Sequence, residues 1–191
     1  MRQRLRREFF EELYDNSDDP WRFATSEYER NKYERTLGAL GNRRFRRALE
    51  VGSSIGVFTA LLAPRCDELL AVDTSERAVE LARRRLRALP QVRVERRTIP
   101  EEMPEGPFDL VLASEVLYYS PRDAMLDTLR RLEGSLAPGG LLLAVHWRGE
   151  TETYPLLGDE VHELLAAHTR LTGTLSMTEP EYRLDLFKGE A

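Results

Sequence analysis

The chain has 191 residues, of which 32% are charged and 41% are hydrophobic, and its formal net charge at pH 7 is −5. This length fits one domain with a substantial core, and no apolar run approaches the roughly 20 residues that a membrane helix needs. The acidic balance disfavours a general nucleic-acid binder, and the single cysteine, Cys66, excludes an internal disulfide.

Two helices separated by a turn are predicted for residues 1–41, one around residues 5–14 and one around residues 27–40. The residues from Asp15 to Pro20 are turn formers, and Ser26 is suited to cap the second helix. Because aromatic side chains are dense here, the helices either pack their rings on the rest of the protein or form a lid over a ligand. The basic N-terminus is followed by no apolar signal segment, so we expect a cytoplasmic location.

From residue 48 onward, short apolar strands alternate with amphipathic helices. Strands are predicted near residues 48–51, 68–73, 92–96, 108–113 and 140–146, and helices near 56–63, 75–89, 122–136 and 156–168. Two further strand-like runs, 171–176 and 182–187, predict a terminal hairpin at one edge of the sheet. The alternation indicates a parallel sheet covered by helices on both faces. We therefore expect a single domain, residues 1–191, with a helical segment at 1–41 and an α/β core at 42–191.

A strand, a glycine-containing turn and a helix follow one another in residues 48–59 and predict a nucleotide-binding turn. The glycines, Gly52 and Gly56, do not have the Gly-x-Gly-x-x-Gly spacing of a pyrophosphate dinucleotide site. Glu50 precedes them and would repel a phosphate but attract a cationic group. Asp73 ends the next strand, where an acid can bind both ribose hydroxyls. A ligand with a ribose, a cationic end and no phosphate fits this pattern best.

Together with this turn and Asp73, the segments 108–115 and 136–142 resemble the motifs of the class I methyltransferases that use S-adenosylmethionine. The resemblance implies a three-layer α/β/α Rossmann-like fold whose seven-stranded, mostly parallel sheet ends in an antiparallel hairpin strand. It implies S-adenosylmethionine as the cofactor, with Trp21, Arg22 and Tyr28 closing over its methionine end and Thr98 and Ile99 meeting the adenine. The full set of residues expected at this cofactor is Trp21, Arg22, Tyr28, Glu50, Gly52, Ser53, Ser54, Gly56, Asp73, Thr74, Thr98, Ile99 and Ser114.

A narrower resemblance extends outside this core. The segments 19–23, 114–119, 146–149 and 154–156 look like those of the nodulation protein S family, whose members N-methylate the free amine of a deacetylated chitooligosaccharide. The resemblance implies N-methyl transfer to an amine of a small molecule, an amino sugar or an oligosaccharide. It leaves the identity of that acceptor open.

Candidate catalytic residues lie after two of the predicted strands. Glu115 and Tyr118 follow the strand at 108–113, and His146 ends the strand at 140–146. Because the carboxyl ends of parallel strands form the ligand-binding edge of such sheets, we expect these three side chains on the acceptor side. An amine acceptor must lose a proton, which an acid or a histidine can take. His146 is equally well explained as a histidine whose hydrogen bonds are satisfied by backbone at the strand end.

His162 and His168 are six residues apart on a predicted helix and make a poor metal pair, so no metal site is expected.

The sequence leaves alternative functions open. An O-methyltransferase of a small metabolite is the main alternative, followed by an NAD(P)-dependent oxidoreductase and a non-catalytic module that binds the cofactor. The expected partner is a small-molecule or amino-sugar substrate, with no nucleic acid and no membrane.

Overall fold

The computed structural model describes residues 2–191. They fall into two compact units, one comprising Arg6–Thr98 and the other comprising Met1–Leu5 with Ile99–Ala191. The seven strands have the order β3-β2-β1-β4-β5-β7-β6 in a mixed sheet, which confirms the predicted fold class. The predicted organisation as a single domain with a lid at residues 1–41 stays a prediction.

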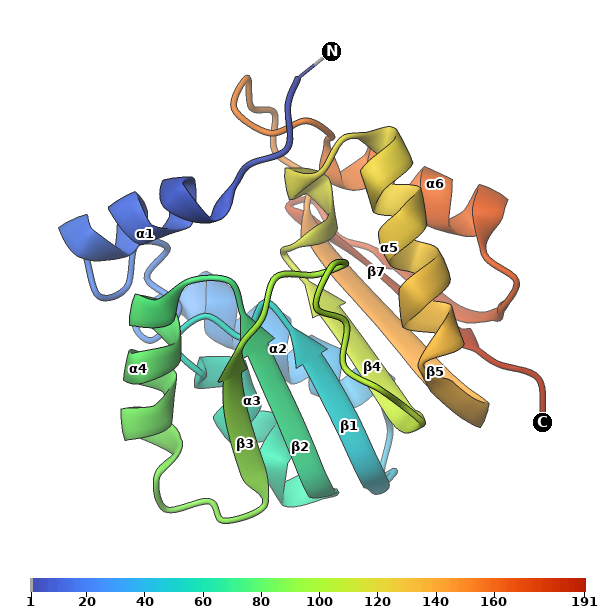
Figure 1. The fold of residues 1–191 in the computed structure, drawn as a ribbon. Helices are drawn as coiled ribbons and strands as arrows, with labels where there is room; N and C mark the ends of the chain where they lie inside the picture. Colours follow the sequence, from blue (N-terminus) through green and yellow to red (C-terminus); the bar gives the residue numbers. More distant parts are fainter. Residues whose placement is uncertain (1) are drawn as a thin grey trace. The chain divides into compact units, whose positions relative to one another are not determined.

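The unit Arg6–Thr98 contains three parallel strands, four α-helices and one 3-10 helix. In chain order its elements are α1 (Arg7–Asn16), α2 (Glu27–Ala39), β1 (Phe45–Val51), α3 (Val57–Leu62), the 3-10 helix η1 (Ala63–Arg65), β2 (Cys66–Asp73), α4 (Glu76–Leu86) and β3 (Val92–Arg96). Figure 1 shows α2 and α3 behind the strands of this unit and α4 beside β3. Strand β1 pairs in parallel with β2, and β2 pairs in parallel with β3.

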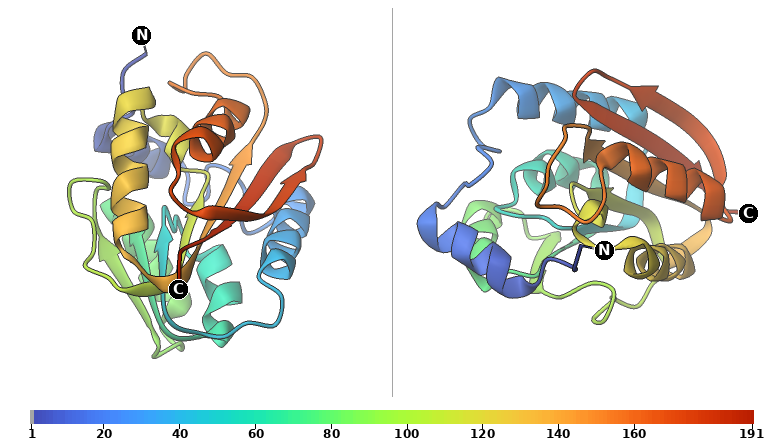
Figure 2. Two further views of the ribbon diagram at one scale, coloured as in Figure 1. Left: turned by 90° about the vertical axis from the view of Figure 1, so that its right-hand side faces the viewer. Right: turned by 90° about the horizontal axis from the view of Figure 1, so that it is seen from above.

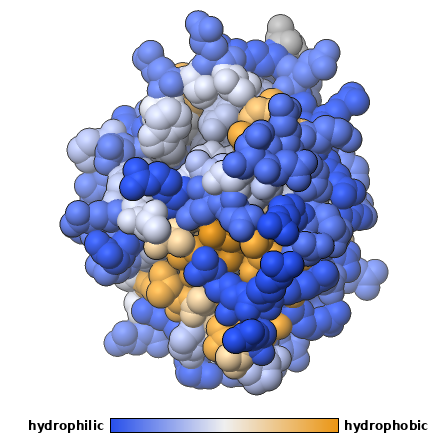
Figure 3. Space-filling view, turned by 90° about the vertical axis from the view of Figure 1, so that its left-hand side faces the viewer, coloured by the Kyte–Doolittle hydropathy of each residue, from blue (hydrophilic) through white to orange (hydrophobic). Residues whose placement is uncertain are grey.

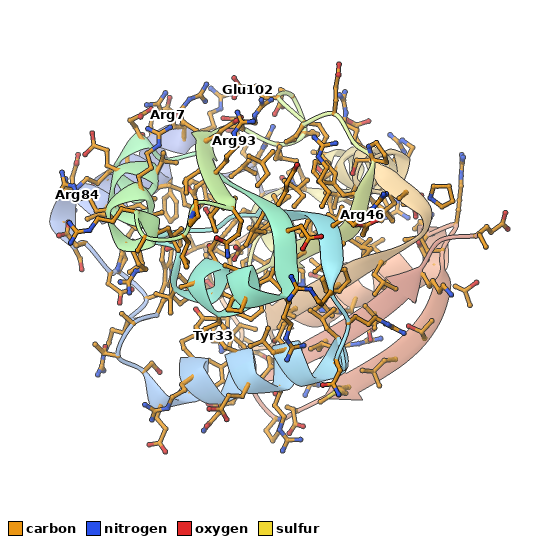
Figure 4. All side chains as sticks on the ribbon, turned by 90° about the horizontal axis from the view of Figure 1, so that it is seen from below. Arg7, Tyr33, Arg46, Arg84, Arg93 and Glu102 are labelled. Atoms are coloured by element: carbon orange, nitrogen blue, oxygen red, sulfur yellow. The ribbon has the colours of Figure 1, made fainter. Side chains whose placement is uncertain are left out.

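Helices α2 and α4 of this unit begin at serine caps, and α4 also has one apolar face. The Ser75 hydroxyl accepts the N–H of Ala78 at 3.1 Å and caps α4, as its sequence predicts. The same helix buries Val79 and Leu86 and leaves the arginines of its last turn exposed; the outward direction of Arg84 is visible in Figure 4.

Helix α2 is held against α3 by aromatic packing. The Ser26 hydroxyl accepts the N–H of Glu29 and starts the helix where its sequence predicts. Tyr33, labelled in Figure 4, lies with its ring centroid 5.2 Å from that of Phe58 in α3. The predicted aromatic packing of this segment is therefore seen within its own unit.

The unit that includes Ile99–Ala191 begins its regular structure at β4. Its elements are β4 (Phe108–Ser114), the 3-10 helix η2 (Leu117–Tyr119), α5 (Arg122–Gly134), β5 (Leu136–Trp147), α6 (Gly158–His168), β6 (Thr172–Thr178) and β7 (Tyr182–Lys188). Strands β4 and β5 are parallel, whereas β7 runs antiparallel to both β5 and β6. Figure 2 shows the β6–β7 hairpin with α6 alongside, so the predicted terminal hairpin is confirmed.

Strand β5 starts earlier than predicted. We expected a helix through Leu136 and a strand from residue 140, but α5 ends at Gly134 and β5 begins at Leu136. The reason is a backbone hydrogen bond of 2.8 Å from the Phe108 N–H to the Ser135 carbonyl, which places Leu136 opposite Phe108 at the start of the ladder. A register shift between Phe108 and Leu110 accommodates the residues that the sequence marks as a loop.

A surface groove lies between α4 and β3. It has a volume of about 430 Å³ and is lined by apolar side chains, including Leu86, Leu89 and Val92, with Arg83, Arg87 and Arg93 among them. Figure 3 shows apolar side chains gathered among polar ones on this face of the molecule. None of the predicted site residues lines it. Within residues 2–191, no helix combines the length and the apolar character that a membrane span requires.

Replacement of Gly56 by alanine tests the turn that joins β1 to α3. Gly56 has φ +76, and a Cβ there would lie 2.8 Å from the Leu86 Cδ1. We expect Gly56→Ala to lower the free energy of unfolding by about 3 kcal/mol, because left-handed strain and overpacking add. Gly38→Ala in α2 is the control, since nothing lies within 4 Å of its Cβ position, and it should leave stability within about 1 kcal/mol of the parent. Equal effects in urea unfolding would contradict this account.

Candidate functional site

The glycine turn after β1 is anchored to β2 by one carbonyl. Val51 and Val72 lie opposite each other at the ends of the two parallel strands. The N–H groups of Gly52 and Ser53 both donate to the Val72 carbonyl, at 2.8 and 3.0 Å. Because β1 and β2 end level, Glu50 and Asp73 are brought to the same edge of the sheet, as the sequence predicts.

Three residues of the turn have left-handed backbone conformations, with φ of +76 at Gly52, +49 at Ser54 and +76 at Gly56. Ser54 stands where many class I methyltransferases carry glycine, and a non-glycine residue in this conformation costs roughly 1–2 kcal/mol. Two hydrogen bonds offset that cost. The Ser54 N–H donates to the Asp73 Oδ2 at 2.9 Å, and the Ser54 hydroxyl is bonded to the Tyr14 hydroxyl at 2.5 Å.

Glu50 offers a buried carboxylate oxygen to a ligand. It is only 3% exposed, and its Oε2 has no hydrogen-bond partner among the described residues. Burial and the nearby charge of Asp73 together raise the pKa of Glu50 to about 8, although the neighbouring Thr59 hydroxyl opposes the rise. The buried hydroxyl of Ser53 is also without a hydrogen-bond partner in the part of the chain that the structure describes. A cationic amino group of a ligand fits this site, because it would satisfy the carboxylate and remove the cost of its burial.

Asp73 has both carboxylate oxygens bonded to backbone. The N–H of Ser54 donates to Oδ2 at 2.9 Å and that of Ser75 donates to Oδ1 at 3.0 Å. Burial raises the pKa of Asp73 above its ordinary value despite these two bonds. Each oxygen keeps a second lone pair, so the oriented carboxylate can still accept from two hydroxyls of a ribose.

Helix α1 contacts the glycine turn through Tyr14 and the start of α4 through Glu11, two residues that the sequence did not lead us to select. The Glu11 carboxylate accepts the Ser75 hydroxyl at 2.7 Å and the Glu76 N–H at 2.9 Å, and so it sits at the N-terminus of α4. Tyr14 is buried and bonds Ser54. Glu11 and Tyr14 are three residues apart and therefore lie on one face of α1. The helix predicted around residues 5–14 already placed them on the same face, and this was the signal that could have identified them.

Of the three aromatic and basic residues predicted to close over the cofactor, Trp21 is brought to the turn. Its ring lies 5.7 Å from that of Tyr14, and it packs on the cluster of Tyr14, Ile55 and Ala78. Arg22 is exposed with φ +60, next to Trp21 in the chain. Tyr28 is the second residue of α2 and has the Lys32 Nζ 5.0 Å from its ring centroid. Closure of this segment over a ligand stays a prediction.

The remaining residues predicted to bind the cofactor, including Thr98 and Ile99 near the adenine, fall on both sides of the division between the units. Thr98 follows β3, and its hydroxyl lies 2.9 Å from that of Thr74, so these two residues are paired. Ile99 begins the second part of the other unit, where its carbonyl accepts a hydrogen bond from Arg4. Ser114 ends β4 opposite Val145 of β5.

On the acceptor side, Glu115 is held in one orientation. It follows β4 with φ +56, and its N–H donates to the Val145 carbonyl at 2.8 Å. The Tyr118 hydroxyl and the backbone N–H of Trp147 both donate to the Glu115 Oε2, the latter at 3.0 Å. A carboxylate fixed by two donors on one oxygen is suited to accept a proton from a positioned group.

Tyr118 belongs to a cluster of three tyrosines. Its ring stacks on that of Tyr154 with centroids 4.9 Å apart, and Tyr119 meets both rings edge-on. Burial raises the pKa of Tyr118 well above its ordinary value, and the Glu115 carboxylate raises it further. Tyr118 therefore stays protonated and acts as a donor that orients Glu115, not as a base.

His146 is fully buried, and both of its ring nitrogens take part in hydrogen bonds. Its Nε2 accepts the Leu117 N–H at 3.2 Å, and its Nδ1 lies 3.2 Å from the His162 Nε2. This geometry favours the interpretation of His146 as a histidine satisfied at a strand end. In the part of the chain that the structure describes, no group of three or more His, Cys, Asp or Glu is arranged to hold a metal ion.

The sheet order places the chain in the class of Rossmann-like methyltransferase folds. The crystal structure of the N-methyltransferase NodS from Bradyrhizobium japonicum WM9 in complex with S-adenosyl-L-homocysteine matches with a TM-score of 0.81 and 25% identity, covering 92% of this chain and 94% of that one. The family model for nodulation protein S (NodS) matches residues 2–150, and the chain belongs to this family.

Two curated nodulation proteins S show the same relationship. The protein of Rhizobium tropici is 35% identical over 129 residues, which cover 66% of this chain and 54% of that protein. The protein of Bradyrhizobium diazoefficiens is 37% identical over 134 residues, covering 66% of this chain and 61% of that protein. This chain therefore spans little more than half the length of these two relatives. The predicted family resemblance is confirmed.

The raised pKa of Glu50 predicts that cofactor binding releases a proton. The free protein carries a proton on Glu50 at pH 7, since the pKa is about 8. A ligand ammonium group favours the ionised form, so S-adenosylhomocysteine should release close to one proton on binding, and its affinity should rise with pH up to about 8 and then level off. Isothermal titration calorimetry in buffers of different ionisation enthalpy measures the release.

The control for this measurement is Glu50→Gln, which keeps the shape of the side chain and has no proton to lose. It should bind more weakly, with the same heat in every buffer. Buffer-independent heats for the parent protein at pH 7 would contradict the proton linkage.

Proposed function

We propose that this chain is an S-adenosylmethionine-dependent methyltransferase that transfers a methyl group to an amine of a small molecule, an amino sugar or an oligosaccharide. The observation that carries the proposal is the pair of acids at the ends of adjacent parallel strands. Within residues 2–191, one oxygen of Glu50 has no hydrogen-bond partner, and the Asp73 carboxylate is oriented by two backbone N–H groups. The match to a structure described as an N-methyltransferase supports the choice of an amine.

The residues that would hold the cofactor differ in the part of it that each would contact. Glu50 would face the cationic amino group of its methionine end, and Asp73 would accept the ribose hydroxyls. Thr74 and Thr98 lie beyond Asp73, at the ends of β2 and β3, and would border the adenine. When bound, S-adenosylmethionine supplies an electrophilic methyl group on a sulfonium centre. The transfer then needs an aligned lone pair more than covalent help from the protein.

Glu115 is the base that this proposal assigns to the acceptor. An amine that gains a methyl group must give up a proton, and the Glu115 carboxylate can take it while the Tyr118 hydroxyl and the Trp147 N–H keep it in place. Tyr118 holds its own proton too strongly to serve, and the Nε2 of His146 already accepts a backbone N–H.

The alternatives differ in what they require of the site. O-methylation of a small metabolite would use the same cofactor residues, so the acceptor must be tested directly. An oxidoreductase is disfavoured by the glycine spacing, and a non-catalytic module would leave the orientation of Glu115 without a use. A small-molecule partner and a cytoplasmic location complete the proposal.

Replacement of Asp73 tests the cofactor assignment. Asp73→Ala should weaken binding of S-adenosylhomocysteine by roughly 10²- to 10⁴-fold, because two charge-assisted hydrogen bonds to the ribose are lost, each worth about 1.5–3 kcal/mol. Calorimetry measures the dissociation constant. Asp109→Ala, on β4 outside the proposed site, is the control and should bind as the parent does. Unchanged affinity in Asp73→Ala would remove Asp73 from the site.

Methyl transfer itself is tested with S-adenosylmethionine carrying a labelled methyl group. We expect label on the amine of a deacetylated chitooligosaccharide or of a simpler amine, and none on matched alcohols. Glu115→Gln should lower kcat by roughly 10²–10⁴-fold while leaving cofactor affinity unchanged, because an amide can accept the same hydrogen bonds but not a proton.

Glu150→Gln, an exposed acid close to the end of β5, is the control for charge and should retain full kcat. Label on alcohols alone would favour the O-methyltransferase. Cofactor binding with no labelled product from amines, alcohols or thiols would favour the binding module. A Glu115→Gln protein with parental kcat would exclude Glu115 as the base.

A further inference from the structure

A buried chain of three ionisable side chains lies behind Glu115 in the same unit. The Asp185 Oδ2 of β7 lies 2.7 Å from the His162 Nδ1 of α6, and the His162 Nε2 lies 3.2 Å from the His146 Nδ1 of β5. The exposed fractions are 3% for Asp185 and 0% for both histidines. We refer to Asp185, His162 and His146 as the Asp-His-His chain.

The backbone N–H of Leu117, which contacts the His146 end of the Asp-His-His chain, sets the direction of every hydrogen bond in it. The Leu117 N–H can only donate, so the His146 Nε2 must be the acceptor and its proton must be on Nδ1. That proton is donated to the His162 Nε2, which forces the second proton of the chain onto the His162 Nδ1. The His162 Nδ1–H then donates to Asp185, the one partner able to accept. The backbone N–H of Leu117 at one end therefore fixes both histidine tautomers, and the Asp185 carboxylate at the other end accepts the last hydrogen bond.

The other end of the chain holds the residues of the acceptor site. Leu117 is the first residue of η2, and the next residue, Tyr118, donates its hydroxyl to Glu115. The His146 ring also meets the Tyr118 ring edge-on, with centroids 5.2 Å apart. His146 thus holds η2 by its backbone and by its aromatic ring at once, and η2 in turn sets where the Glu115 carboxylate points.

The Asp-His-His chain fixes the direction of the His146 ring and does not carry protons to the acceptor site. It ends at a backbone N–H, which does not take up a proton from His146 under ordinary conditions. Burying three polar groups costs free energy that apolar side chains of similar size would not, so a stabilising role alone is a weak explanation for them. A fixed ring direction at His146 is what an apolar replacement would not provide.

Asp185 is suited to this task because it is ionised. Burial alone would raise its pKa, but the hydrogen bonds from His162 and Ser176 and the charge of Arg183 hold the pKa below its ordinary value. The Arg183 Nε lies 3.2 Å from the Asp185 Oδ2. Ser176 faces Asp185 from the neighbouring strand β6.

We propose that Asp185 and His162 are positioning residues for the transfer reaction, acting through His146 and η2 to orient Tyr118 and Glu115. This inference rests on the proposed function in that Glu115 is taken as the base. It extends the acceptor site to two residues on α6 and β7, neither of which would touch the substrate.

The hydrogen-bond chain can be tested without turnover. In the full-length protein labelled with ¹⁵N, long-range ¹H–¹⁵N spectra should show His146 and His162 both protonated on Nδ1, and His162→Leu should accelerate hydrogen exchange of the Leu117 amide at least tenfold. His168→Gln is the matched control, because His168 is an exposed histidine on the same helix. A proton on Nε2 of either buried histidine, or unchanged exchange at Leu117, would overturn the inference.

Turnover then separates positioning from general destabilisation. We expect His162→Leu to lower kcat at least tenfold with little change in the KM for S-adenosylmethionine. His162→Gln should recover much of that loss, because its amide can accept from His146 and donate to Asp185 at once. His168→Gln should match the parent.

Loss of cofactor affinity and kcat together in both His162 variants would indicate a structural role and overturn the inference. Parental kcat in His162→Leu would overturn it as well, while the proposed function stands. Failure of the parent protein to methylate any amine would instead overturn the proposed function, and the exchange and tautomer measurements would still decide whether the chain positions η2.

Discussion

The arrangement of the acids in the unit Arg6–Thr98 depends on the hydrogen bonds that the carbonyl oxygen of Val72 accepts. By accepting the N–H groups of both Gly52 and Ser53, it fastens the turn after β1 to the end of β2. The two strands end level because they are parallel and in register, so their acids arrive at one edge. A shift of one residue between β1 and β2 would direct the turn elsewhere and separate Glu50 from Asp73.

The two acids at this edge, Glu50 and Asp73, differ in their hydrogen bonds because their surroundings differ. Asp73 accepts two backbone N–H groups, whereas Glu50 keeps an oxygen with no partner among the described residues and is protonated near neutral pH. Asp73 is thus oriented to accept hydrogen bonds from hydroxyl groups, and a bound cation would favour the charged form of Glu50. In the other unit, Glu115 gains its direction from donors, which is the property a base needs before its affinity for protons matters.

Much of the fold could be predicted from sequence because the signals are local. The Ser75 cap of α4 and the glycine turn each depend on residues a few positions apart, and both are confirmed. Tyr14 could not be found this way, since its partner Ser54 is 40 residues away and is reached only when α1 folds back. The partner of His162 was missed for the same reason: spacing along α6 says nothing about Asp185 on β7. The early start of β5 likewise depends on pairing with β4.

Ser54 has a consequence for how this family varies. A left-handed residue other than glycine is tolerated here because the Tyr14 hydroxyl and the Asp73 carboxylate hold its side chain and its N–H. Glycine at position 54 would need no such support and would leave the hydroxyl at position 14 without its partner. The two positions are therefore expected to change together across relatives, with serine accompanied by tyrosine and glycine accompanied by residues that lack a hydroxyl. The hydrogen bond between these two side chains links the glycine turn to the first helix, although 40 residues separate them in the sequence.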